Sequence, residues 1–580
     1  MFSLDTLLQD LAPHRHTPTW QRTVLRTLLF EQEMQQFAQR HPHLRGLDLV
    51  EEILDYFDLD CEMVEGDLEN IPSHGPVVLV ANHPIGSLDG LALLRHVASV
   101  RPDVRIVASQ LLSYVEPLKS LFFSVDNFSN RTNRQQIAHI QTHLNQDGAV
   151  ILFPAGEVSR ISLHGIRDGH WHSGFIRMAA KARAPIVPIH IKGRNSGLFY
   201  LSSLIYRPLS TLLLVREMFH QRGNKLSLRI GPQIPYATWS QGEWQANDMA
   251  ARFRRHVYRL GQGKPGCFAG EKPIALPEDR SRLKRALTEC DVLGTTPDGK
   301  TIYLYQRKDE DYSPILRELG RLREIAFRAV GEGCGMRRDL DHFDDHYLHL
   351  VLWDEEKLDI VGAYRFTTTA HQDPHQLYSH SLFQYGSEME TILASGIELG
   401  RSFIQPKYWG KRGLEYLWLG IGAYVARYPQ YRYLFGPVSL SGTLPITARD
   451  LLVAFYRLYF PPRQPLARSR RPYPASLPDV LKQFEGTDYQ QDLTRLKSML
   501  NNLGCAIPTL YKQYSELCET GGVQFIDFGI DPDFNNCIDG LVLVDLKQLK
   551  PSRYQRYIAP FAAESAPEDA PQSDKAEVPG

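Results

Sequence analysis

The run VVLVANHPIGSLDG, residues 77–90, joins an apolar segment to a tight turn and the start of a helix. Its first five residues predict a buried strand, and Pro84 and Gly86 predict a turn. The turn separates His83 from Asp89, which lies at the start of an amphipathic pattern. A neutral imidazole beside a carboxylate can remove a proton from a hydroxyl group. The run therefore predicts acid–base chemistry at the end of a strand.

The surrounding sequence predicts an α/β domain. Helical stretches separate five short apolar segments, which we expect to be strands at 77–81, 104–108, 149–153, 186–191 and 226–230. We assign residues 61–260 to this domain and residues 1–60 to a helical region before it. In open α/β sheets the loops at the carboxyl ends of the strands build the site, so the turns after the strands at 77 and 149 should share one crevice.

A second α/β pattern follows a segment rich in turn signals. We expect a linker at 261–300, a second domain at 301–560 and a disordered tail at 561–580, which is rich in Pro, Ala and acidic residues. The second domain should contain helices at 315–330 and 413–427 and strands at 347–353, 359–367 and 396–404. No internal repeat relates the halves. The predicted fold class is therefore α/β, with two different domains joined by a linker.

Composition narrows the function classes. At 580 residues the chain is too long for one core, and its net charge of -1 gives no global field that would attract nucleic acid. Seven scattered cysteines without a Cys-x-x-Cys pair favour reduced thiols in the cytosol. No window reaches the roughly 18 uninterrupted apolar residues of a spanning helix. Two shorter segments, 111–125 and 201–219, fit either buried helices or helices resting on a bilayer.

Further polar elements follow the first run in a fixed order. The strand at 149–153 leads into Pro154-Ala155-Gly156-Glu157 and then Arg160, Arg131 lies on an earlier loop, and a later strand carries Pro185 and Pro188. Over roughly residues 60–240 this order resembles the glycerolipid acyltransferase family. The resemblance implies that His83 is the general base for an acceptor hydroxyl and that Asp89 orients it. It places substrate-binding groups at Asn82, Arg131, Gly156, Glu157 and Arg160.

Two departures from the family pattern point to a particular branch. Five residues rather than four separate His83 from Asp89, and Ala155 replaces the family glutamate, with Glu157 two positions later. This variant resembles the branch that acylates lyso-ornithine lipids. The longer spacing requires a turn that glycine tolerates best, at Gly86. An isolated His-x5-Asp pattern could be coincidental, and the ordered companions favour the acyltransferase.

The second domain has a strand, a basic turn and an apolar helix in succession. Glu398 and Arg401 lie on the strand, and the turn contains Gly410, Lys411, Arg412 and Gly413. A helix N-terminus preceded by glycines offers free amides and a positive dipole to a phosphate group, and the Lys-Arg pair adds formal charge. This pattern favours a phosphate-bearing ligand at the turn.

With the Phe343–Arg365 region and Asp531-Pro-Asp-Phe-Asn…Asp539, this module resembles the acyl-carrier-dependent branch of the GNAT-like N-acyltransferases over about residues 300–558, most closely ornithine N-acyltransferases. The resemblance implies that the turn at 410–413 holds a phosphopantetheine arm. Glu398 and Arg401 would then lie beside the thioester and the amino-acid acceptor. Glu398 could take the proton of the attacking amine or position it. A structural salt bridge between Glu398 and Arg401 is the alternative.

Together the two resemblances imply a bifunctional enzyme of ornithine lipid synthesis. Acyl carrier protein would supply the thioester, the substrates would be an amino acid and a lyso-lipid, and no bound cofactor or metal is expected. The enzyme would work at the inner face of a bacterial cytoplasmic membrane. Another amino acid (glycine, glutamine or lysine), or a haemolysin-like lipid-binding protein, remain the alternatives.

Two further clusters have competing interpretations. The spacing of His342, His346 and His349 could suggest a metal, but the second resemblance makes this segment a structural connection. A basic cluster in the Pro/Arg-rich segment 463–478 is either a solvated loop or a docking surface for an acidic carrier protein or an anionic membrane; its members are Arg463, Arg468, Arg470 and Arg471.

Overall fold

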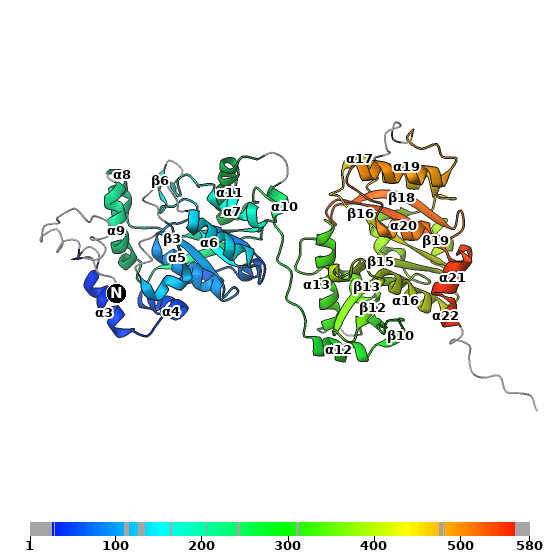
Figure 1. Cartoon of the computed structure of the whole chain (residues 1–580), viewed down its shortest axis with the longest axis horizontal. Helices are drawn as coiled ribbons and strands as arrows, with labels where there is room; N and C mark the ends of the chain where they lie inside the picture. The colour runs from blue at the N-terminus through cyan, green and yellow to red at the C-terminus, as the bar shows by residue number, and fades with distance from the viewer. Residues whose placement is uncertain are drawn as a thin grey trace, which may run out of the picture. The chain divides into compact units, whose positions relative to one another are not determined.

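A computed structural model of the chain describes residues 26–27, 30–109, 115–125, 134–162, 165–205, 207–240, 244–308, 312–474, 480 and 482–562. It divides into two compact units, Met1–Pro273 and Ile274–Gly580. Figure 1 shows a sheet flanked by helices in each unit. The α/β fold class with two different domains is confirmed.

The first unit is built on a seven-stranded sheet. Its neighbouring strands are all parallel except for β8 and β9, which are antiparallel. In spatial order the strands are β1 (Asp60–Met63), β9 (Lys225–Ile230), β8 (Ile186–Lys192), β2 (Val77–Ala81), β5 (Ala149–Leu152), β3 (Arg105–Ser109) and β4 (Phe122–Val125). Five of these are the strands expected from sequence; β1 and β4 are additional.

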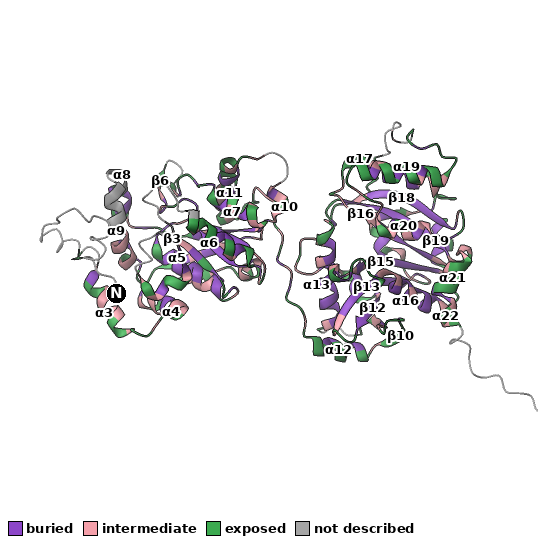
Figure 2. Cartoon of the chain, in the orientation of Figure 1, coloured by how far each residue is buried: buried purple, intermediate pink, exposed green. Residues whose placement is uncertain are grey.

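Helices cover both faces of this sheet, and β2 supplies side chains to each side. Val77 and Leu79 pack with α4 (Gly46–Tyr56) and α5 (Ser87–Ala98). Val78 and Val80 pack with helices on the opposite face, which are α6 (Arg134–Asn145), α7 (Gly174–Ala182) and α11 (Ala246–Gly261). Figure 2 shows the strands of the sheet as buried. A strand buried on both faces explains the uninterrupted apolar run before Asn82.

The two apolar segments singled out in the sequence adopt different structures. Residues 116–121 form a 3₁₀ turn that leads into β4, and residues 110–114 lie outside the described part of the chain. The second segment forms α8 (Gly197–Ile205) and α9 (Arg207–His220), which pack against each other. Among the described residues, no helix combines the length and apolarity needed to cross a bilayer.

The second unit contains an eight-stranded sheet in which every neighbouring pair is antiparallel except β15 and β16. In spatial order the strands are β10 (Asp291–Thr295), β11 (Thr301–Gln306), β12 (Leu348–Asp354), β13 (Asp359–Thr368), β15 (Gly396–Ile404), β16 (Tyr433–Leu440), β19 (Cys537–Asp545) and β18 (Val523–Asp531). α13 (Pro314–Ala329) covers one face. α16 (Gly413–Arg427), α17 (Ile446–Tyr459) and α20 (Thr509–Ser515) cover the other.

The parallel pair at the centre of this sheet separates along its length. β15 and β16 are paired only from Gly396–Tyr433 to Glu398–Phe435, although both strands continue beyond that point. A Cβ atom at Gly436 would lie 2.0 Å from the Leu399 carbonyl oxygen, so a glycine is required where the strands part. Beyond this point the two strands are no longer paired with each other.

The remaining elements complete the two units. The first contains α3 (Glu31–Arg40), α10 (Tyr236–Trp239) and the hairpin of β6 (Arg160–Ser162) and β7 (Gly165–Arg167). The second contains α12 (Arg280–Thr288), α14 (Tyr378–Leu382), α15 (Met389–Leu393), α19 (Tyr489–Asn502), α21 (Pro551–Tyr557) and α22 (Ala559–Ala562), together with a small sheet of β14 (Phe383–Tyr385) and β17 (Ala467–Ser469).

Three sequence expectations differ from this arrangement in detail. The range 261–300 contains α12 and β10, which belong to the second unit, so the extended connection is shorter than expected. The Pro/Arg-rich segment contains the strand β17 rather than loop alone. The expected disordered tail lies, from residue 563 onward, outside the described residues.

Candidate active sites

His83 and Asp89 form a pair at the carboxyl end of β2. The Nδ1 atom of His83 lies 2.9 Å from Oδ1 of Asp89, and the Asp89 side chain is completely buried. No hydrogen bond within the described part of the chain reaches Nε2 of His83, and 19% of its side chain is exposed. This geometry suits a general base, because one ring nitrogen is held by the carboxylate and the other is available to a hydroxyl group.

The turn between them explains the five-residue spacing. The second carboxylate oxygen of Asp89 accepts hydrogen bonds from the backbone amides of Ile85 (2.9 Å) and Gly86 (3.3 Å). Gly86 has φ 119° and ψ −133°, a conformation that is strained for other residues. The longer loop therefore folds back onto the carboxylate, and Asp89 reaches His83 in spite of the extra residue.

The surroundings of His83 set its basicity. Burial works to lower the pKa of the imidazole, but the adjacent Asp89 carboxylate outweighs it and the pKa lies above its ordinary value. The ring stacks on Phe153, at the end of β5, with 4.2 Å between the ring centroids. His83 is therefore fixed in orientation by an ion-pair partner on one side and an aromatic ring on the other.

Asn82 has a structural role. Its side-chain amide donates to the carbonyl oxygen of Ile191 at 2.8 Å, and its side-chain oxygen accepts from the amide of the same residue at 2.8 Å. Both polar ends of the side chain are thus used to join β2 to β8. The predicted contact of Asn82 with substrate is not favoured by this geometry, and the residue instead positions the backbone of His83.

The turn after β5 approaches the same point from the neighbouring strand. Gly156 has a φ of 66°, and Glu157 and Arg160 form an ion pair at 3.0 Å. The amide of Ser159 donates to the carbonyl oxygen of His83 at 2.7 Å, so this loop adjoins the base, as expected. Arg131, the remaining predicted substrate-binding residue of this domain, lies outside the described residues.

Asp168 is a positioning residue that the sequence did not single out. It is buried and accepts hydrogen bonds from the amide of His83 (3.2 Å), the hydroxyl of Ser159 (2.5 Å) and the indole of Trp171 (2.9 Å). Burial raises the pKa of its carboxyl group. Asp168 thus joins the two loops of the site. Its only sequence signal was a polar residue three positions before a tryptophan.

In the second domain, Glu398 is fully engaged by the protein. One carboxylate oxygen accepts from the amide (2.6 Å) and hydroxyl of Ser379, and the other from the amide of Tyr378 (3.2 Å) and the hydroxyl of Tyr347. Burial raises the pKa of Glu398. Because four donors already surround it, Glu398 is better suited to holding α14 against β15 than to accepting a proton from a substrate.

Replacing Glu398 with glutamine is therefore expected to destabilise the second domain. The new NH₂ group would face donors, so a buried donor loses its acceptor, which costs about 1–3 kcal/mol. Chemical denaturation of E398Q beside the exposed control E390Q measures this cost. Unchanged stability together with lost N-acylation would instead identify Glu398 as a catalytic residue.

Arg401 does not pair with Glu398. Its guanidinium forms ion pairs with Asp339 at 3.3 Å and Asp341 at 3.6 Å and donates to the Tyr378 hydroxyl at 3.0 Å. Arg401 has a φ of 48° at an irregularity in the pairing of β13 and β15, which turns it toward the loop after α13. The alternative of a Glu398–Arg401 salt bridge is therefore wrong.

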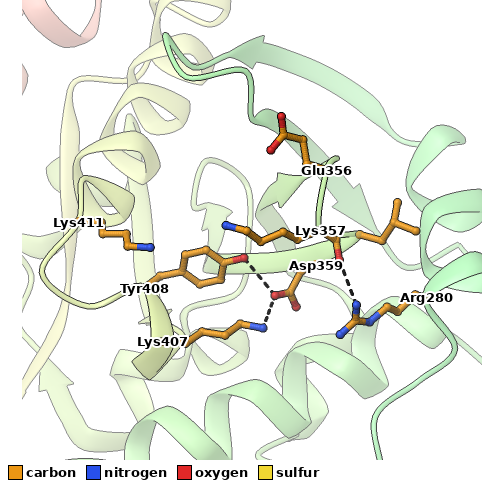
Figure 3. Close-up of a pocket in the computed structure, with 8 residues that line it drawn as sticks. Arg280, Glu356, Lys357, Asp359, Lys407, Tyr408 and Lys411 are labelled. Carbon is orange, nitrogen blue, oxygen red and sulfur yellow. Dashed lines mark hydrogen bonds and ion pairs between the residues drawn. The ribbon is translucent and has the colours of Figure 1, made fainter.

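The basic turn lies beside a cationic pocket (Figure 3). The ammonium groups of Lys357, Lys407 and Lys411 each lie 5.4 Å from the centre of the Tyr408 ring, in a cavity of about 430 Å³. Asp359 accepts from the Tyr408 hydroxyl at 3.1 Å and pairs with Lys407, whereas Lys411 forms no ion pair with a described residue. This pocket can hold a phosphate group at its Lys411 side.

The other residues of the turn play supporting parts. Gly410 has a φ of 75°, and Gly413 is the first residue of α16, where a Cβ atom would come within 3.0 Å of Ile404. Arg412 is paired with Glu415 at 2.7 Å, so its charge is partly neutralised. Lys357 and Lys407 were missed from sequence because their meeting point depends on how the β12–β13 turn folds.

The histidines considered as metal ligands belong to different environments. His349 is fully buried beside Arg323, and burial together with that guanidinium lowers its pKa to about 3. His342 lies in a 3₁₀ turn that leads toward β12. In the described part of the chain, no group of three or more His, Cys, Asp or Glu side chains is arranged to hold a metal.

Comparison with known proteins assigns both domains. A family model described as "Acyltransferase" matches residues 7–259, and a model described as "Acetyltransferase (GNAT) domain" matches residues 322–419. The chain is a two-domain acyltransferase. This acyltransferase carries the His83–Asp89 pair in its first domain and the separated strands β15 and β16 in its GNAT domain. The protein is therefore an enzyme, and the alternative of a protein that only binds lipid is not supported.

Relatives of the two-domain acyltransferase perform two kinds of transfer. It is 29% identical over 307 residues to a glycine Nα-acyltransferase of Bacteroides thetaiotaomicron, covering 50% of this chain and 90% of the relative. It is 29% identical over 273 residues to a lyso-glycine lipid O-acyltransferase of the same organism, covering 45% and 97%. An L-ornithine Nα-acyltransferase of Brucella abortus is 32% identical over 140 residues, covering 21% and 49%.

Proposed function

We propose that this enzyme acylates one amino acid twice, first at its amine in the GNAT domain and then at a hydroxyl of the attached acyl chain in the first domain. The observation that carries the proposal is the His83–Asp89 pair, a hydroxyl-activating arrangement, in a chain that also has a GNAT domain. The hydroxyl would be that of a 3-hydroxyacyl group. The named activities of the relatives, one N-acylation and one O-acylation, support the same division.

The acyl donor is a thioester on acyl carrier protein. The lysine pocket around Tyr408 supports this choice, because it offers positive charge to the phosphate of a phosphopantetheine arm at the turn before α16. Neither transfer needs a bound cofactor, since a thioester is already activated. Exposed Arg468, Arg470 and Arg471 add a second basic region that would meet an acidic carrier or anionic lipid headgroups.

Reversing the charge of Lys411 is expected to raise the KM for a carrier-bound thioester about tenfold or more, because local positive charge increases the encounter rate with an acidic partner. The KM for a short thioester without the phosphate should change little. Steady-state kinetics of K411E with both donors, beside the exposed control K512E, measure the difference. An equal change with both donors would argue against a role in binding the carrier.

The acceptor is a free α-amino acid, either ornithine or glycine. The resemblance in the GNAT domain first suggested ornithine, and relatives that act on ornithine support it. Two other relatives are covered by this chain over 90% and 97% of their length. They act on glycine and on a lyso-glycine lipid, which favours glycine. Glutamine and lysine have no relative that supports them here.

Isotope feeding tests this function directly. Bacteria expressing the chain are grown with labelled glycine or labelled ornithine, and their lipids are analysed by mass spectrometry. The proposal expects one label in a new diacylated lipid that contains one amide and one ester. Incorporation of neither label into any new lipid would contradict it.

The enzyme would act at the inner face of a bacterial cytoplasmic membrane, where its first product is already anchored. Exposed apolar side chains beside the first site support this location. They lie on α8 (Leu198 and Leu201) and on the adjacent β6–β7 hairpin (Ile161 and Ile166). The hairpin begins at Arg160, so these side chains could enter the headgroup region next to the loop that adjoins His83.

A further inference from the structure

A set of buried carboxylates lies beside the part of β16 that is not paired with β15. Strand β19 lies between β16 and β18. Its residue Asp539 lies opposite Ser439 on β16 and opposite Gly529 on β18, and Gly529 has no side chain. Asp531 lies two residues from Gly529 on β18, so it shares the face of Asp539. The hydroxyl of Ser439 donates to Glu332 at 2.8 Å. Three strands and the loop after α13 thus bring these acids together.

Asp539 lacks the partners that satisfy its neighbours. Its side chain is only 5% exposed, and its one hydrogen bond in the described structure is a weak one from the Cys537 thiol to Oδ1 at 3.8 Å. By contrast, Asp531 accepts from the amide of Asp533 (2.9 Å) and the hydroxyl of Tyr378 (3.2 Å). A buried carboxylate with a single weak donor is costly, so the position of Asp539 points to a cationic donor that arrives with a ligand.

Glu332 offers a second acceptor beside it. Its side chain is 8% exposed, and Ser439 is its only hydrogen-bond partner in the described structure, which leaves one carboxylate oxygen open. Arg401, the nearest cation, forms its ion pairs with Asp339 and Asp341 instead.

We propose that Asp539 and Glu332 bind the ammonium group of the acceptor amino acid beside the unpaired parts of β15 and β16, and that Asp539 is the base that removes its proton. This assignment rests on the proposed N-acylation. It gives to Asp539 the role that the sequence suggested for Glu398, whose oxygens are already occupied.

The reaction balances with these two groups. Asp539 takes one proton from the ammonium, and the nitrogen lone pair then attacks the thioester carbonyl carbon to form the C–N bond. The C–S bond breaks as sulfur takes its electron pair, and the leaving thiolate receives the second proton from nitrogen. Asp539 later releases its proton to water. The products are the amide, the free thiol and one proton.

The electrostatics of the cluster fit this role. Burial and the charges of Asp531 and Glu332 raise the pKa of Asp539 to about 8, against the opposing effect of Arg401. Burial raises the pKa of Glu332 to about 7. Cys537 and the hydroxyls of Tyr378 and Tyr511 also face Asp539, and the pKa of all three is raised, first by burial. A base must be ionised to accept a proton, so amide formation should fall as the pH drops through this range.

The test compares D539N with the wild-type chain in amide formation across pH. If Asp539 is the general base, D539N should form the amide about 100- to 10,000-fold more slowly than the wild-type chain near neutral pH. This role also predicts partial recovery at alkaline pH, where the amino acid loses its proton to water before binding. E332Q should mainly raise the KM for the amino acid. D545N is the control, because Asp545 lies on the same strand but is paired with Arg432.

Each outcome decides the proposal. Wild-type rates in D539N, or a loss that is the same at every pH, would overturn the role of Asp539 as the base. Alkaline recovery cannot come from an unfolded domain, so it separates lost chemistry from lost structure, and thermal unfolding provides a second check. If the wild-type chain forms no amide with any amino acid, the proposed function fails rather than this assignment.

Discussion

Replacing His83 with alanine is expected to stop ester formation while amide formation continues, so that the monoacylated amide accumulates. The imidazole is held at 2.9 Å from buried Asp89, which leaves its Nε2 atom to take the hydroxyl proton. Loss of a general base lowers the rate by about 100- to 10,000-fold. Lipid mass spectrometry of cells that express H83A measures both products.

The exposed residue His139 on α6 provides a matched control, because H139A removes an imidazole from the same domain without touching the site. The pH dependence gives an independent readout. Since the Asp89 carboxylate raises the pKa of His83 despite its burial, ester formation should fall as the pH drops through a value above that of free histidine. Continued ester formation in H83A would show that another group is the base.

Replacing Arg365 with methionine is expected to destabilise the second domain by about 3–5 kcal/mol, the usual cost of breaking a buried ion pair. Arg365 is fully buried and lies 2.5 Å from Asp341 and 3.2 Å from Asp344. It also lies over the rings of Tyr347 and Tyr378. Without it, Asp341 keeps only the longer pair with Arg401. The segment that carries Asp341 and Asp344 would lose this buried cation.

Hydrogen exchange measured by mass spectrometry shows whether the loss of stability is confined to the second domain. Peptides from residues 274–562 of R365M should exchange faster, and peptides from residues 30–273 should not change. R307M is the control, because Asp345 in the Arg307–Asp345 pair is exposed and surface pairs contribute about 0–1 kcal/mol. Equal protection in R365M and R307M would mean that the buried network does not hold the domain together.

The first site could be predicted largely from sequence because its parts are local. The apolar run, the turn at Gly86 and Asp89 are contiguous, and the loop after β5 joins them through one parallel strand pairing. The sequence did not predict that the Asn82 side chain joins β2 to β8. That role depends on Ile191, which is more than one hundred residues away. Asp168 was missed for the same reason.

The second site was predicted less well because its chemistry is assembled from distant segments. Glu398 lies on the expected strand, but its partners Tyr347, Tyr378 and Ser379 come from two other segments and turn it into a structural residue. Asp539 lies in a motif that the sequence did single out. Its importance became visible only when the register of β16, β18 and β19 placed it beside Glu332 without a strong donor.

The order of products formed by the purified full-length chain tests the central claim most directly. The chain is incubated with the labelled amino acid identified by feeding and a 3-hydroxyacyl thioester of acyl carrier protein, and the products are followed by mass. The two-step account predicts that the monoacylated amide appears first and is then converted to the diacylated lipid. An ester product that appears before the amide, or an amide that is never converted, would contradict it.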